Sequence, residues 1–105
     1  MVLDDGMLIG NARKVADFTA KNRLPAIGFR EYFDAGGLMA YAANFPLIWR
    51  RASFFIDKIL KGTKPADLPV VQVSNFDLVV NLKTAKDLGL TIPQSLLQRA
   101  DQVIE

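Results

Sequence analysis

Two short, unbroken apolar runs constrain the fold of this chain more than any other feature. Residues 25–29 and 38–42 contain no charged or amide side chain. Runs of this length are typical of strands that are buried on both faces of a parallel sheet. Parallel neighbours need a crossover connection, and residues 31–35 between the runs predict one helical turn, stopped by Gly36 and Gly37. The sequence therefore predicts an α/β fold in which helices flank parallel strands.

Two amphipathic patterns accompany these runs. From residue 9 to residue 22 apolar side chains recur mostly three or four positions apart, which predicts a helix. A longer pattern begins at Pro46, a favoured first helical residue, and ends at Gly62, a favoured left-handed terminator. A helix followed by a strand suggests a βαβ unit, whose first strand would consist only of Val2 and Leu3. We therefore expect the chain to start within a strand.

The last third of the chain predicts a connector, a strand and two helices. Residues 64–69 include two prolines, which restrict their own backbone and that of their predecessors, so we expect no regular structure there. The elements expected after this connector are a strand over 76–82, a short helix over 84–88 closed by Gly89, and a helix over 95–100 or a longer one frayed to Glu105. The chain then divides into residues 1–45, a partial ligand-lobe βαβ unit; residues 46–62, the long helix; and residues 63–105, the C-terminal part.

Composition excludes several classes of function. The chain has 105 residues, 50% of them hydrophobic, which is enough for one domain. It has no Cys and no His, so a thiolate nucleophile and the commonest general base and metal ligand are missing. A net charge of +2 is too small to indicate nucleic-acid binding. No phosphate-binding, dinucleotide or calcium-loop pattern occurs. We expect no enzyme, no cofactor, no metal and no nucleic-acid partner.

Polar side chains beside the apolar runs are candidates for a binding site. Tyr41 and Asn44 lie at the expected carboxyl end of the second run, where parallel sheets bind ligands. Asp4 and Asp5 are the only adjacent acidic pair. A solvated loop explains these two acids more simply than a binding role does.

The long helix carries two further features with alternative explanations. Arg50 and Arg51 could meet an anionic partner, although adjacent cations usually form a solvated helix edge. Trp49, Phe54 and Phe55 could form an interface, but their helical spacing also fits packing on a sheet.

Six motifs distributed along the chain form a specific series. They are RLPAI at 23–27, AGGLM at 35–39, DKILKG at 57–62, KPADLP at 64–69, NLKTA at 81–85 and LGLTIP at 88–93. The series resembles the C-terminal part of ABC transporter substrate-binding proteins of the tryptophan/tyrosine-receptor type. The resemblance covers essentially the whole chain.

This resemblance implies a partial lobe of the type I periplasmic-binding-protein fold, in which two α/β lobes close over a small ligand. Members capture a small molecule, often an amino acid, and deliver it to an ATP-driven ABC permease without catalysis. The resemblance places Asp4 and Asp5 in a polar loop after the first strand and turns Phe29, Arg30 and Glu31 towards the cleft. It also implies that Asn44 binds the amine or amide group of a ligand.

A complete receptor would be roughly three times this length if each lobe is a normal domain. We therefore expect a truncated piece whose ligand binding is incomplete, because a cleft needs two walls. Exposed strand edges predict a homodimer or larger assembly, formed at these edges or by exchange of the segment after residues 64–69. The alternative function is a structural or regulatory oligomer without small-ligand binding. The family resemblance predicts a periplasmic location, whereas the missing signal peptide predicts a cytoplasmic one if the chain is expressed as written.

Overall fold

Helix α3 (Arg30–Asp34) connects strands β1 (Ile27–Gly28) and β2 (Met39–Ala43), as the sequence predicts. In the computed structural model, which describes all 105 residues, β1 and β2 pair in parallel. Ile27 lies opposite Met39, and Gly28 lies opposite Ala40. The predicted βαβ step is therefore confirmed.

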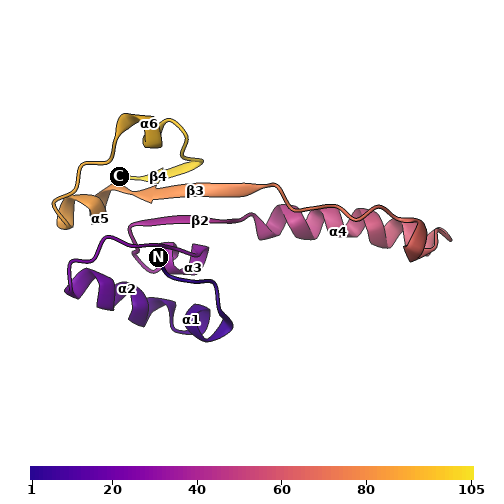
Figure 1. Cartoon of the computed structure of the whole chain (residues 1–105), viewed down its shortest axis with the longest axis horizontal. Coiled ribbons are helices and arrows are strands. Elements are labelled where there is room, and N and C mark those ends of the chain that lie inside the picture. Colours follow the sequence, from indigo (N-terminus) through magenta and orange to yellow (C-terminus); the bar gives the residue numbers. More distant parts are fainter. The chain divides into compact units, whose positions relative to one another are not determined.

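The sheet has four strands in the order β1-β2-β3-β4. Strands β3 (Phe76–Asn81) and β4 (Gln102–Ile104) are parallel, with Val79 opposite Gln102. The two central strands run in opposite directions, because the amide of Asn81, the last residue of β3, donates to the carbonyl of Leu38 just before β2 (Figure 1). The α/β class is thus confirmed, and the sheet consists of two parallel pairs joined by an antiparallel contact.

The N-terminal helix is interrupted where the sequence predicts continuity. Helix α1 (Gly6–Gly10) ends at Asn11, and helix α2 (Ala12–Lys21) begins one residue later. The side-chain amide of Asn11 donates to the Met7 carbonyl at 2.9 Å, a local bond that competes with the helical pattern. Val2 lies beside β1, because its amide donates to the Ile27 carbonyl at 2.8 Å. It forms no assigned strand.

Two predictions for the C-terminal third are corrected. The connector contains one turn of 3-10 helix, η1 (Pro65–Asp67), which tolerates proline at its first position. The final helix is only α6 (Gln94–Leu97), and the chain then forms β4 rather than extending the helix to Glu105. Asp101 fixes this strand, since its Oδ2 accepts the Leu78 amide at 2.8 Å. The predicted short helix is α5 (Leu82–Asp87), capped by the Asn81 side chain and closed by Gly89 at φ +73°.

Two clusters of buried residues form the core, and α3 contributes to both. Tyr32 packs with Ala16 and Phe29, on the side of the N-terminal helices. The next residue, Phe33, packs with Ala40 and Val79 of the sheet. Consecutive residues of a helix point about 100° apart, so one helical turn can join these two clusters. The Tyr32 hydroxyl remains satisfied by a 3.1 Å hydrogen bond with the Thr19 hydroxyl.

The chain forms two compact units, Met1–Ala42 with Asp77–Glu105, and Ala43–Phe76. All buried residues lie in the first unit. The second unit consists of helix α4 (Phe45–Leu60), η1 and an extended segment that follows it. Helix α4 matches the predicted long helix, and Gly62 at φ +103° ends it as expected. No helix in the structure has the length and apolar character needed to cross a membrane.

Candidate ligand-binding site

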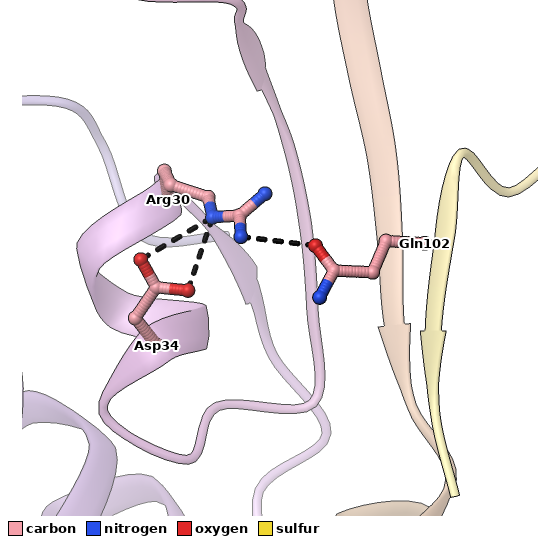
Figure 2. A network of polar contacts seen from close by, with 3 residues as sticks. All are labelled: Arg30, Asp34 and Gln102. Carbon is pink, nitrogen blue, oxygen red and sulfur yellow. Dashed lines mark hydrogen bonds and ion pairs between the residues drawn. The ribbon is translucent and has the colours of Figure 1, made fainter.

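The Arg30 side chain is held in place at the carboxyl end of β1. Its Nε donates to both carboxylate oxygens of Asp34, at 3.0 and 3.2 Å, and its Nη2 donates to Oε1 of Gln102 at 2.9 Å (Figure 2). The guanidinium carbon lies 5.6 Å from the centre of the Phe33 ring. A helix residue, a strand residue and an aromatic ring therefore orient one cation.

The sheet explains how Gln102 reaches this cation from far along the chain. Gln102 lies opposite Val79 in the β3–β4 ladder, and Val79 packs against Phe33 of α3. Residues opposite each other in a ladder point to the same face of the sheet. Gln102 consequently shares the face that α3 covers, where Arg30 lies.

The guanidinium keeps hydrogen-bonding capacity beyond this network. Arginine has five N–H donors, and the protein uses the donor on Nε and one on Nη2. Both donors on Nη1 and the second donor on Nη2 have no partner in the chain. The Arg30 side chain is 41% exposed, so these donors can reach a ligand from solvent. Planar, bidentate donors of this kind suit a carboxylate.

The neighbours of Arg30 differ in exposure. Phe29, predicted to face a ligand, is buried and makes an edge-to-face contact with Tyr32, with ring centroids 6.3 Å apart. Here it forms part of the core. Glu31 lies exposed in the first turn of α3. Arg30 and Glu31 are thus consecutive residues of opposite charge in the first turn of this helix, with side chains that point about 100° apart.

Asp4 and Asp5 lie at the start of α1, shortly after Val2, which borders β1. Asp5 is the N-cap of this helix, and its Oδ1 accepts the Met7 amide at 2.9 Å. Asp4 is exposed. The capping bond gives Asp5 a structural role independent of any ligand.

Tyr41 and Asn44 belong to different units. Tyr41 lies in β2 with its side chain exposed, whereas Asn44 belongs to the second unit and is the N-cap of α4. The Oδ1 of Asn44 accepts the Leu47 amide at 3.0 Å. Of the predicted site residues, only Asn44 lies outside the first unit. Phe29, Arg30 and Glu31 are consecutive there, at the start of α3.

The cap of α4 gives a testable expectation. Asn44→Ala should destabilise the helix by about 1 kcal/mol, because the Leu47 amide loses its acceptor. Far-UV circular dichroism should show a loss of helix content. Asn44→Asp keeps an oxygen acceptor and should retain the helix; an equal loss in both variants would contradict the capping role.

Sequence reasoning missed Asp34 and Gln102. Asp34 had a local signal, since it lies four residues after Arg30 and such pairs face each other on a helix. Gln102 had none, because it is 72 residues away and no strand was predicted there, only a helix over 95–100 or a longer one frayed to Glu105. No group of three or more acidic side chains is placed to hold a metal ion.

Comparison with known proteins extends these observations. The family described as ABC transporter substrate binding protein matches residues 1–104. No curated protein matches the sequence. A conserved domain protein from Vibrio cholerae O1 biovar El Tor aligns with a TM-score of 0.87 and 25% identity, covering 97% of this chain and 36% of its own.

Two further solved structures share the fold. An ABC domain from Streptococcus pneumoniae, solved in complex with L-Trp, has a TM-score of 0.83 and 32% identity, over 95% of this chain and 35% of that protein. A ligand-free, open substrate-binding protein with adhesive properties from Clostridium difficile aligns with a TM-score of 0.69 and 22% identity, over 98% of this chain and 36% of its own. The chain therefore spans little more than a third of the length of these proteins. With a family match over residues 1–104, it belongs to the ABC transporter substrate-binding protein family.

Proposed function

We propose that this chain forms one wall of a small-molecule receptor that supplies an ABC permease. The ligand is a compound with a carboxylate, of the amino-acid class, and it docks on Arg30. The role is capture and delivery without catalysis, on the periplasmic side where receptors of this kind work. The second wall of the cleft lies outside these 105 residues, so the chain alone binds weakly.

The oriented guanidinium carries this proposal. Asp34, Gln102 and Phe33 restrict Arg30, which reduces the conformational entropy lost when a ligand binds. Three N–H donors remain for an anion, and a fork of this shape matches a carboxylate. Glu31 is adjacent and exposed, and its negative charge suits the ammonium group of an amino acid. The Streptococcus relative, which was solved with L-Trp, suggests the first ligand to test.

Thermal unfolding with L-tryptophan tests this function. A single-site ligand at 100 times its dissociation constant stabilises a protein by about 2.7 kcal/mol. We expect a saturable rise in melting temperature as L-tryptophan is titrated towards its solubility limit. Tryptamine has the same ring and amine but no carboxylate, so it should give little or no rise.

Arg30→Gln should weaken L-tryptophan binding roughly tenfold or more, because it removes charge-assisted hydrogen bonds to the carboxylate. The variant should still fold, since the Arg30–Asp34 ion pair is exposed and contributes at most about 1 kcal/mol. Arg13→Gln, which changes an exposed residue of α2, is the matched control and should bind like the unmodified chain. Equal responses to tryptophan and tryptamine, or equal binding by both variants, would contradict the proposal.

A second candidate is an oligomer that reuses the fold without small-ligand binding. It is favoured by the second unit, in which large apolar side chains are exposed and no residue is buried. Exchange of the C-terminal segment between copies is a poor explanation of these exposed side chains. The residues from Asp77 onwards belong to the first unit of their own chain. Helix α4 offers a better surface for such an assembly.

A further inference from the structure

The Gln102 side chain carries hydrogen-bond donors that the chain leaves unused. Its Oε1 accepts from Nη2 of Arg30 at 2.9 Å. Because a guanidinium has only donors, the carbonyl oxygen of this amide faces Arg30, and the NH2 group is the free branch (Figure 2). Gln102 is exposed, and neither N–H of its Nε2 has a partner in the chain. Two free donors therefore lie next to the guanidinium.

Strand β4 fixes the position of these donors. Asp101, the residue before this strand, is bonded twice to Leu78. Its amide donates to the Leu78 carbonyl at 2.8 Å, and its Oδ2 accepts the Leu78 amide at 2.8 Å. Gln102 follows directly and lies opposite Val79 in the β3–β4 ladder. The anchored backbone and the bond to Arg30 restrict the Gln102 side chain at both ends, so little conformational entropy is lost when a ligand binds there.

The free side of the guanidinium is the side that Gln102 borders. Asp34 accepts only from Nε, whereas Gln102 accepts from Nη2. A ligand carboxylate consequently approaches Nη1 and Nη2 of Arg30, away from the negative charge of Asp34. A bidentate pair with Arg30 uses two of the roughly four lone-pair sites of a carboxylate. The remaining sites can accept from further donors, and those on Nε2 of Gln102 are adjacent.

We propose that Gln102 is a second ligand contact, which selects a carboxylate against the corresponding amide. The inference rests on the proposed function of Arg30. The Nε2 of Gln102 donates to one carboxylate oxygen while Arg30 binds the same group as a fork. An amide presents an NH2 group in place of one oxygen, so donors would face donors and hydrogen bonds would be lost. The ligand class is thereby narrowed to free amino acids with an ionised carboxyl group.

Gln102→Glu tests this contact, because it exchanges the free NH2 group for an oxygen at nearly the same position. The variant keeps an oxygen acceptor for Arg30, which separates the ligand contact from the positioning of the guanidinium. L-tryptophan and L-tryptophanamide differ only in the group under test. The unmodified chain should bind L-tryptophan about tenfold or more tightly than the amide, and Gln102→Glu should lose or reverse this preference. Thermal unfolding with each compound measures both affinities.

Gln98→Glu is the matched control for the added charge. Gln98 is an exposed residue of the same unit, at the C-cap of α6. The control should keep the preference for L-tryptophan, and both variants should keep the far-UV circular dichroism spectrum of the unmodified chain. A merely structural role of Gln102 would change the binding of both compounds equally. An unchanged preference in Gln102→Glu would therefore overturn the proposal.

Sodium acetate separates this inference from the proposed function, because acetate is a carboxylate without a ring or an ammonium group. In nitrogen-15 NMR spectra, the Arg30 Nε and Gln102 Nε2 signals should both shift as acetate is added, and sodium chloride at the same concentration should not reproduce the shifts. A shift of Arg30 alone would overturn the role of Gln102 and leave the proposed function standing. Shifts of both signals without a response to L-tryptophan would support the carboxylate contact and contradict the choice of amino acid. No shift of either signal would contradict both proposals.

Discussion

Phe33→Ala is expected to cost about 3 to 5 kcal/mol of folding free energy, the range for truncating a fully buried phenylalanine. Phe33 is 1% exposed and packs against Ala40 and Val79, where α3 meets the sheet. The substitution leaves a cavity in a core of few buried residues and removes the ring beneath Arg30. Small domains have about 5 to 15 kcal/mol in total. The cooperative thermal transition should therefore move to much lower temperature or disappear.

Phe54→Ala is the matched control for this experiment. Phe54 lies on α4 and is 56% exposed, so the same truncation creates no buried cavity. Its ring makes an edge-to-face contact with Phe55 and lies 5.4 Å from the Lys58 Nζ, both at the surface, so the expected loss is below about 1 kcal/mol. Chemical denaturation of both variants measures the difference. Comparable losses would show that the sheet-facing cluster is not the main source of stability.

Gly37→Ala is expected to destabilise the fold by about 2 to 3 kcal/mol, at the upper end for overpacked cores. A Cβ on Gly37 would lie 2.5 Å from Cδ1 and 2.6 Å from Cζ of Tyr32. The Tyr32 ring cannot move aside easily, because it is buried against Phe29 and its hydroxyl bonds to Thr19. Either the ring or the turn before β2 must shift.

Gly10→Ala provides the control, since a Cβ there meets no atom within 4 Å. Gly10 is the last residue of α1, where alanine is favoured over glycine, so the change should be neutral or stabilising by about 0.5 to 1 kcal/mol. The urea concentration at the midpoint of unfolding measures the stability of both variants. A Gly37→Ala protein as stable as the unmodified chain would show that the Tyr32 pocket can expand.

Both expectations concern the first unit, where every buried side chain lies. The second unit has a groove but no buried residue, so its order depends more on helix propensity and capping. Local unfolding of α4 should therefore cost less free energy than global unfolding.

The candidate site was partly predictable from the sequence. The strand and the helical turn that border the site were predicted from local patterns, and Arg30 lies between them with its side chain 41% exposed. Its orientation was not predictable, because Gln102 reaches it from the other end of the chain. The same holds for Phe29, whose burial depends on contacts with Tyr32 and Ala16 rather than on its own position in sequence.

The sequence by itself determined the local elements with strong patterns. Two apolar runs predicted β1 and β2, a long amphipathic pattern predicted α4, and Gly62 and Gly89 marked where helices end. These features depend on residues within a few positions of one another, so short-range sterics and periodicity suffice.

Only the tertiary structure decided the antiparallel contact between β2 and β3, the strand β4 and the network around Arg30. A strand of three residues has too few interactions to be stable alone and exists because β3 offers it hydrogen bonds. Strand direction likewise depends on pairing between residues about 40 positions apart, such as Leu38 and Asn81. Local patterns contain no information on such pairing, because the free energy that selects it is gained only when distant segments meet.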